Sequence, residues 1–347
     1  MPWTNIKSED KRTYDYQLNN QSQRVISYID SIHETLEQSM ALDSKIFLMG
    51  QGINDKVGMF GMTNGLSQEF GKERVFDTPL AENGLTGVAV GTAMSGMHPI
   101  YFHNRPDFLM LAMDQIVNHA SKFCYMSAGQ FNVPLIIWAV TGKGWGSAAQ
   151  HSQALQALFM HIPGLKIIMP TTPYDVKGLL VSAISDKNPV LVLDHRRLHN
   201  QDGYVPSELY KIPFGKGVIR RKGNDITLVG ISEMLIECLD AAELLEKDGI
   251  DAEVIDLRTI KPFDLDIIVH SVKKTHRLII ADTGWKCSGV AAEIATSVYE
   301  RAFADLVCPI ERIVLPDLPT PAAYTLEECF YKTAKDIYCV TKKILRN

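Results

Sequence analysis

Short apolar runs without polar interruption alternate with segments of helical periodicity along most of this chain. Ile46–Met49, Val133–Val140 and Val190–Leu193 are the clearest of these runs. Because a strand that is apolar on both faces must be covered on both faces, such runs predict a parallel sheet between two layers of helices. The alternation restarts at Asp225–Gly230, after a polar stretch. The sequence therefore predicts two doubly wound α/β domains.

The polar stretch suggests where the domains divide. Residues 195–215 carry Gly203, Pro206 and Pro213 and show no strong periodicity. A chain of 347 residues is also long for a single domain. We therefore expect an N-terminal arm over residues 1–20, a first domain over 21–200, a linker over 201–215 and a second domain over 216–347.

The spacing of apolar residues also places helices between the strands. It predicts a helix over 25–38, a long helix over 108–126 and a helix over 152–160, among others. Each would pack its apolar face on the predicted sheet of the first domain.

Composition excludes several functional classes. The chain is 46% hydrophobic and 22% charged, with a formal net charge of −5, which disfavours nucleic acid and anionic membranes as partners. The six cysteines form no C-x-x-C pair and no zinc-like cluster with histidine, so reduced thiols are expected. The N-terminus lacks an apolar signal region, and no run is long enough to span a membrane. A cytoplasmic protein is expected.

Glu82 is the first candidate for chemistry. It follows a short strand and Pro79, and it precedes a segment of small residues in which Gly84, Gly87 and Gly91 recur at helical spacing. Because glycine weakens a helix by about 1 kcal/mol relative to alanine, such a face usually marks a close backbone approach. Glu82 is either a carboxylate that faces the helix dipole or a functional acid, and this pattern leaves both open.

Two further strand-to-helix junctions carry polar side chains. His151 ends a glycine-rich loop that begins at Gly142, at the expected start of the next helix, where the dipole favours a neutral imidazole. His103 and Arg105 follow another predicted strand, and Phe108 comes next. His151 could instead bond only to backbone, and Phe108 could belong to the core. Since ligands bind at the carboxyl ends of parallel strands, the junctions are expected to converge on one crevice.

Long motifs in both halves resemble the E1 beta subunits of the 2-oxoacid dehydrogenase complexes. The resemblance extends from about residue 22 to the C-terminus. It implies a transketolase-like pyrimidine-binding domain followed by a transketolase C-terminal domain. The motifs that carry it are Phe76–Glu82, Phe108–His119, Ala149–Gln153, His161–Pro170, Pro173–Leu180, Asp186–Pro189, Ala252–Pro262 and Ser271–Thr275.

The resemblance implies roles for several residues. Glu82 matches the glutamate that hydrogen-bonds the aminopyrimidine of thiamine diphosphate and exchanges a proton with it, a task that suits a buried carboxyl group. Phe108 matches the aromatic residue that packs on the aminopyrimidine, and Leu80 is expected to contact the cofactor. His151 matches a histidine that orients substrate or assists acyl transfer to a lipoyl group. The cofactor would then serve as the electron sink for decarboxylation.

The resemblance also implies partners and ions. In this family an alpha subunit supplies the magnesium and diphosphate site within an alpha-2-beta-2 tetramer that contains a homodimer of beta chains. Consistent with that, neither domain here has a Walker A motif, a G-x-G-x-x-G motif or a Gly-Asp-Gly run followed by a spaced Asn. A lipoyl-bearing E2 protein is a further expected partner. A structural potassium site is implied at Leu135, Ala183, Ile184, Asp186 and Asn188.

The sequence departs from the family pattern on the expected substrate side. Gln51 stands where an acidic residue is usual, His103 lies in an altered loop, and Trp145 replaces part of a glycine-rich loop. The substrate therefore need not be pyruvate or a branched-chain 2-oxoacid. Two enzymatic functions stay open: a 2-oxoacid dehydrogenase component that passes an acyl group to a lipoyl carrier, and a split transketolase-like enzyme that transfers a ketol or aldehyde unit without one.

Overall fold

The computed structural model describes residues 2–6, 24–142 and 146–346 and divides them into two compact units. The first unit contains residues 2–6, 24–141 and 158–214, and the second contains residue 142, 146–157 and 215–346. Each unit is described by itself. Residues 142 and 146–157 thus belong with the second unit, although residues 141 and 158 belong with the first.

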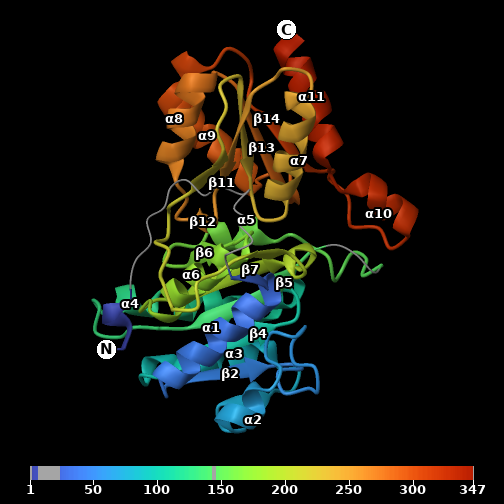
Figure 1. Cartoon of the computed structure of the whole chain (residues 1–347). Coiled ribbons are helices and arrows are strands. Elements are labelled where there is room, and N and C mark those ends of the chain that lie inside the picture. The colour runs from blue at the N-terminus through green and yellow to red at the C-terminus, as the bar shows by residue number, and fades with distance from the viewer. Residues whose placement is uncertain (1, 7–23, 143–145, 347) are drawn as a thin grey trace. The chain divides into compact units, whose positions relative to one another are not determined.

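The first unit is built on a parallel sheet with the strand order β6-β7-β5-β4-β2-β3 (Figure 1). Its centre is fully apolar: Trp138 is buried and its ring stacks on that of Phe102, with centroids 5.2 Å apart. The predicted parallel sheet is confirmed. The strands are β2 (Ile46–Gly50), β3 (Val75–Asp77), β4 (His98–His103), β5 (Ile136–Thr141), β6 (Lys166–Ile168) and β7 (Val190–His195).

Helices and one short ribbon complete the first unit. Ser27 caps α1 by accepting a hydrogen bond from the amide of Asp30, and Thr172 caps α6 in the same way. The helices are η1 (Pro2–Asn5), α1 (Tyr28–Leu42), α2 (Leu66–Phe70), α3 (Glu82–Met94), η2 (Pro106–Ala112), η3 (Gln115–Ala120), α4 (Phe123–Met126), α6 (Pro173–Ile184) and η4 (Arg196–Leu198), and the ribbon pairs β1 (Val25–Ser27) with β8 (Asp202–Tyr204).

Three predicted helices differ from the structure. Residues 25–27 form strand β1, because the Ser27 cap starts α1 only at Tyr28. The predicted helix over 108–126 is a succession of a 3₁₀ turn, a π turn and a short α-helix. Apolar spacing at three and four residues fits all of these turns, so periodicity alone cannot separate them. The helix predicted over 152–160 is α5 (Gln156–Met160), which begins four residues later.

The small-residue face of α3 is open within this chain. A methyl group added at Gly84 or Gly91 would meet no heavy atom within 4 Å among the described residues. At Gly87 it would lie 3.3 Å from the side-chain oxygen of Gln115. Val88, on the same helix, is 54% exposed. The close approach that the glycines predict is therefore made at Gly87, by the Gln115 side chain, and not at Gly84 or Gly91 within the described part of this chain.

The second unit is a doubly wound sheet with the order β14-β13-β10-β11-β9, in which only β9 is antiparallel to its neighbour. Figure 1 shows α7 and α11 on one face and α8 and α9 on the other. The elements are β9 (Val218–Arg221), β10 (Ile226–Gly230), β11 (Ala252–Asp256), β12 (Thr259–Lys261), β13 (Leu278–Trp285), β14 (Glu311–Leu315), α7 (Met234–Glu246), α8 (Leu265–Thr275), α9 (Val290–Ala302), η5 (Phe303–Asp305), α10 (Tyr324–Phe330) and α11 (Ala334–Arg346).

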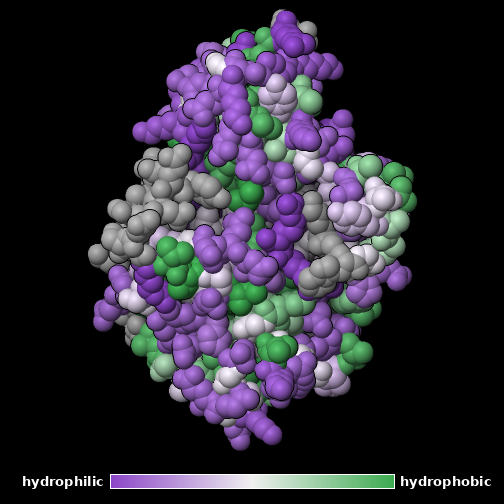
Figure 2. All heavy atoms as spheres, turned by 45° about the vertical axis from the view of Figure 1, so that its right-hand side comes forward, coloured by the Kyte–Doolittle hydropathy of each residue, from purple (hydrophilic) through white to green (hydrophobic). Residues whose placement is uncertain are grey.

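The polarity of the surface agrees with the charged and hydrophobic content of the sequence. On the face shown in Figure 2, hydrophilic residues dominate and hydrophobic residues occur in small groups between them. Within the described ranges, no helix is long and apolar enough to cross a membrane.

Candidate functional site

The carboxyl ends of β2, β3 and β4 meet at one edge of the first sheet. Gly50, the last residue of β2, is in register with Asp77 on one side and Phe102 on the other. The Asp77 carboxylate accepts a hydrogen bond from the amide of Ile53 at 2.8 Å, and the amide of Thr78 donates to the Gly50 carbonyl at 3.1 Å. These bonds hold the loop after β2 against the segment that leads to α3.

Glu82 begins α3 at this edge. Ala81, the residue before it, offers no side-chain cap, and Glu82 is the acidic residue of the first helical turn. The sequence suggested a buried carboxyl group, whereas Glu82 is half-buried in this chain. Leu80, two residues earlier, is 78% exposed. An open apolar side chain and a carboxylate therefore lie next to each other along the chain, at the end of a parallel strand.

Two aromatic side chains of β4 lie near Glu82. Burial raises the pKa of Tyr101 to about 12; the Thr78 hydroxyl opposes this shift and the negative charge of Glu82 adds to it. Burial also lowers the pKa of His103 to about 3, so this imidazole is neutral at physiological pH. The two rings lie 4.1 Å apart between centroids, and Nε2 of His103 has no hydrogen-bond partner among the described residues.

The loop after β4 brings in the substrate-side candidates. The side-chain nitrogen of Asn104 donates a hydrogen bond to the side-chain oxygen of Gln51 at 3.4 Å, so Gln51 and the altered loop lie next to each other. Arg105 is buried. Directly after β7, the Arg196 guanidinium lies 4.6 Å from the ring centroid of Phe60. Burial lowers the pKa of Arg196 to about 10. The positive charge of Arg105 adds to this decrease, and the negative charge of Asp194 opposes it.

Sequence reasoning singled out neither Tyr101 nor Arg196. Tyr101 lies in β4, two residues before its end, and Arg196 directly follows β7, so their position near the carboxyl ends of parallel strands was the available signal. Phe108, which it did single out, is half-buried in η2, and α3 packs against η2. The helix that carries Glu82 and the one that carries Phe108 are thus neighbours.

His151 lies on the second unit and is exposed. It precedes the first residue of α5 by five positions, so the expected effect of a helix dipole on His151 is wrong. Trp145 lies outside the described residues. The junctions of Glu82 and His103 both lie in the first unit, where Tyr101 stands between them, and the predicted convergence of all three junctions on one crevice stays a prediction.

The residues of the predicted potassium site lie in one compact turn after α6, with Leu135 beside it. The Leu135 carbonyl accepts from the Val190 amide at 3.0 Å, and the Ala183 carbonyl accepts from the Asp186 amide at 3.2 Å. The Asp186 carboxylate accepts from the Asn188 amide at 2.9 Å and forms an ion pair with Lys166. Ile184 is the last residue of α6, at the start of this turn. The lysine already balances the Asp186 charge, so the potassium site stays a prediction.

Comparison with known proteins identifies the family. Residues 24–201 match the pyrimidine-binding domain of transketolase, and residues 215–337 match the transketolase C-terminal domain. The chain is 42% identical to the beta subunit of 2-oxoisovalerate dehydrogenase from Bacillus subtilis, over 88% of this chain and 94% of that protein. It is also 42% identical to the beta subunit of the pyruvate dehydrogenase E1 component from Rickettsia felis, over 92% and 98% of the two chains.

The chain belongs to the family of E1 beta subunits. A third relative is the beta subunit of acetoin:2,6-dichlorophenolindophenol oxidoreductase from Bacillus subtilis, 40% identical over 93% of this chain and 98% of that protein. Among solved structures, a split-gene transketolase described as an inactive beta4 tetramer aligns with a TM-score of 0.71 and 23% identity, over 92% of this chain and 97% of that one. That likeness confirms the predicted two-domain transketolase-like fold.

A buried acid in the second unit of this E1 beta-family chain was also not singled out by the sequence. Asp282, on β13, is 1% exposed, and it accepts a hydrogen bond from the side-chain amide of Gln156 at 2.8 Å. Burial raises the pKa of Asp282 to about 6, although Gln156 and the amides of Gly284 and Thr283 favour the charged form. The second carboxylate oxygen of Asp282 and the side-chain oxygen of Gln156 have no hydrogen-bond partner in the described residues.

Asp282 should make the stability of the second unit depend on pH. The pKa is about 6 in the folded chain and 3.8 in the unfolded chain, so the stabilisation is complete below about pH 4 and is lost as the pH rises through 6. Asp282→Asn keeps an acceptor for Gln156 and cannot ionise. We compare the free energy of unfolding of the variant with that of the wild type at each pH. The difference, variant minus wild type, should be larger at pH 7 than at pH 4 by on the order of 2–3 kcal/mol. Urea unfolding at both pH values measures this; parallel pH profiles for the two proteins would contradict it.

Proposed function

We propose that this chain is the beta component of a thiamine-diphosphate-dependent enzyme that decarboxylates a 2-oxoacid and passes the acyl group to a lipoyl carrier. The observation that carries the proposal is the position of Glu82 at the start of α3, after the carboxyl end of β3, in a chain about 40% identical to beta subunits of this family over nine-tenths of its length. The likeness to a split-gene transketolase rests on 23% identity and shows the fold alone, so it favours the split transketolase reaction less than the beta-subunit relatives favour the dehydrogenase reaction.

The residues at the strand ends fit an aminopyrimidine ring. Leu80 offers an exposed apolar side chain, Phe108 lies on the neighbouring helix, and Glu82 supplies a carboxylate at the first turn of α3. Such a set suits a flat, mostly apolar heterocycle with one polar edge. Thiamine diphosphate, when bound, supplies the electron sink for decarboxylation.

The other catalytic and binding roles are proposed for side chains of this chain. Glu82 would hold and exchange a proton with the polar edge of the ring. His103, which burial keeps neutral, and Tyr101, a neutral phenol at physiological pH, would keep this region free of competing charge. His151 would orient substrate or assist acyl transfer, and Gln51, His103 and Trp145 would shape the substrate side.

An alpha-type subunit would complete the enzyme. The chain carries no glycine signature for a diphosphate, so the alpha-type subunit is proposed to supply the magnesium and diphosphate site in an alpha-2-beta-2 tetramer built on a beta homodimer. The open face of α3, with Gly84, Val88 and Gly91, supports close packing against another chain. Potassium at the turn of Asp186 and a lipoyl E2 protein complete the proposal.

Reconstitution tests this function. The chain, co-expressed with an alpha-type subunit of the same organism, should release carbon dioxide from a 2-oxoacid panel and acylate a lipoyl domain only when both subunits, thiamine diphosphate and magnesium are present. Each subunit alone is the control. Ketol transfer to an acceptor aldehyde without lipoyl acylation would replace the proposal with the split transketolase reaction.

A further inference from the structure

The segment that carries His151 has little regular structure of its own. From Gly146 to Leu155 the chain forms turns and bends, with no helix or strand. At Ala148, whose φ is +58°, the chain turns, and the His151 amide donates to the Ala148 carbonyl at 3.4 Å. Because no helix or sheet hydrogen bonds support these residues, contacts with other parts of the fold must determine where they lie.

Side-chain contacts within the second unit provide that support. Gln156, the first residue of α5, is fully buried, and its side-chain nitrogen donates to a carboxylate oxygen of Asp282 at 2.8 Å. Both residues belong to the second unit. Ser152 and Leu155, which lie between His151 and Gln156, are 5% and 9% exposed. The bond to Asp282 is therefore five residues from His151, at the end of a largely buried stretch.

Two glycines allow the chain to approach closely at the ends of this segment. A methyl group at Gly284, two residues after Asp282 on β13, would lie 2.7 Å from the second carboxylate oxygen of Asp282 and 3.3 Å from the side-chain nitrogen of Gln156. A methyl group at Gly146, whose φ is +63°, would lie 3.1 Å from the carbonyl oxygen of Ala322. The segment is thus in close contact with other residues of the second unit at both ends.

Stability alone does not account for the polar pair of Gln156 and Asp282. The second carboxylate oxygen of Asp282 and the side-chain oxygen of Gln156 have no hydrogen-bond partner among the described residues, and burying such groups costs free energy. Two apolar side chains of similar size at buried polar positions are often equally stable or more stable. A hydrogen bond, unlike an apolar contact, depends on distance and angle. The pair therefore suits the positioning of the segment better than the stabilisation of the unit.

We propose that Asp282 is a positioning residue for His151 and acts through Gln156. The inference rests on the proposed function, in which His151 orients substrate or assists acyl transfer. Asp282 fixes the Gln156 side chain and with it the start of α5, so the segment from Gly146 to Gln156 is held at both ends. Asp282 itself, 1% exposed, touches no substrate. Since a misplacement of about 1 Å can cost about 10²-fold in rate, this attachment matters for turnover.

A double variant separates positioning from stability. Asp282→Leu with Gln156→Met replaces both polar side chains with apolar ones of similar size. In the reconstituted enzyme, kcat for acylation of a lipoyl domain should fall by at least about tenfold. The free energy of unfolding at pH 7 should stay at or above that of the wild type. Calorimetry should show unchanged affinity for thiamine diphosphate, because the proposed contacts of Leu80, Glu82 and Phe108 lie in the first unit.

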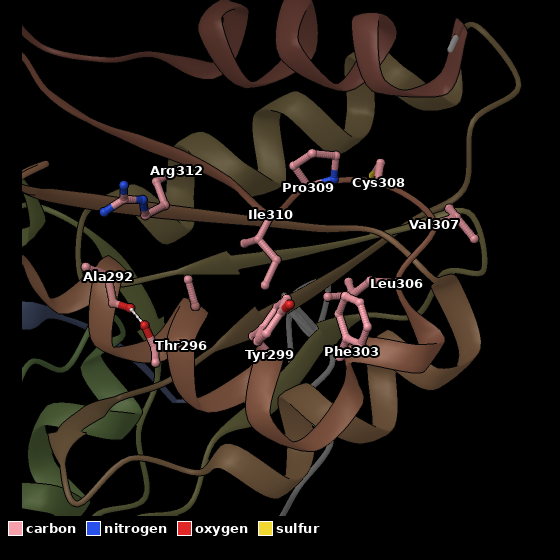
Figure 3. Close-up of a pocket in the computed structure, with 11 residues that line it drawn as sticks. Ala292, Thr296, Tyr299, Phe303, Leu306, Val307, Cys308, Pro309, Ile310 and Arg312 are labelled. Atoms are coloured by element: carbon pink, nitrogen blue, oxygen red, sulfur yellow. Dashed lines mark hydrogen bonds between the residues drawn. The ribbon is translucent and has the colours of Figure 1, made fainter.

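Two further variants supply the rescue and the control. Asp282→Asn keeps an acceptor for Gln156 and should retain most of the kcat that the double variant loses. Thr296→Val should keep the wild-type kcat. Thr296 lines a mostly apolar cavity of about 680 Å³ in the same unit, where its hydroxyl donates to the Ala292 carbonyl at 3.0 Å (Figure 3). Valine removes that hydrogen bond at nearly constant size, so this variant controls for the loss of a hydrogen bond elsewhere in the unit.

Hydrogen exchange of the reconstituted complex gives a readout that does not depend on turnover. The amides of residues 147–155 should exchange faster in the double variant than in the wild type or Thr296→Val, whereas those of β10 and β11 should be unchanged. Unchanged exchange of residues 147–155 would overturn the inference for any reaction that the enzyme catalyses. An unchanged kcat, or a decrease in kcat accompanied by an equal loss of stability or cofactor affinity, would also overturn it. A wild-type enzyme that acts on no 2-oxoacid would instead contradict the proposed function, and the exchange rates would still decide whether Asp282 holds the segment of His151.

Discussion

Glu82→Gln is expected to reduce the turnover of the reconstituted enzyme by about 10²- to 10⁴-fold, the usual contribution of a positioned acid or base. Glutamine keeps the size of the side chain and can still form hydrogen bonds, but it cannot exchange the proton. Because Glu82 is half-buried at the first turn of α3, the free energy of unfolding should change little. Steady-state kinetics with the preferred 2-oxoacid and thermal unfolding measure the two effects.

The neighbouring position supplies the matched control. Asn83→Gln places a glutamine one residue later, at an exposed position of the same helical turn, and should leave turnover unchanged. Calorimetry of thiamine diphosphate binding separates loss of chemistry from loss of cofactor. If Glu82→Gln retains the wild-type rate with the cofactor bound, Glu82 is not the proton-exchanging group, even if the family assignment stands.

The sheets were the most predictable part of the fold. The run Val133–Val140 includes all of β5 except its last residue, Thr141, and it is apolar throughout because neighbouring strands and helices bury both of its faces. The second unit follows the same rule at β10 and β11. Strand existence and parallel direction are local consequences of composition, so a single sequence was sufficient for them.

Helix type and the grouping of segments were less predictable. Periodicity predicted one helix over 108–126, where the backbone in fact changes from a 3₁₀ turn to a π turn. Apolar spacing does not show how many residues each backbone hydrogen bond spans. The segment 142–157 groups with the second unit through buried contacts such as Gln156 with Asp282. A contact between residues so distant in sequence has no local signal.

The candidate site shows the same division. Glu82, His103 and Phe108 were accessible to sequence reasoning because each lies at a strand-to-helix junction, and Glu82 and Phe108 also stand in recognisable motifs. Tyr101 was not, because its position beside Glu82 depends on the register of β4 with the strands next to it. The exposure of Leu80 likewise depends on packing. The sequence could predict which residues carry the chemistry, but only the fold shows what surrounds them.

Asp256→Ala is expected to destabilise the second unit by about 3–5 kcal/mol, the usual effect of removing one partner of a buried ion pair. The Arg220 guanidinium bonds the Asp256 carboxylate at 2.7 and 3.2 Å between β9 and β11, and both side chains are fully buried. The same carboxylate accepts from the Arg258 amide at 3.0 Å. Alanine would leave the guanidinium buried without its carboxylate. Urea unfolding, with hydrogen exchange of β9 and β11 to assign the transition, measures the loss.

An exposed pair in the same unit is the matched control. Arg301 and Asp266 lie 2.7 Å apart, but their side chains are 49% and 70% exposed, so solvent screens the pair and Asp266→Ala should change stability little. The double variant Arg220→Met with Asp256→Leu removes both charges and should be more stable than Asp256→Ala alone. Equal effects of Asp256→Ala and Asp266→Ala would show that burial does not determine the contribution of the pair. A double variant less stable than Asp256→Ala would show instead that the arginine stabilises the sheet through other contacts.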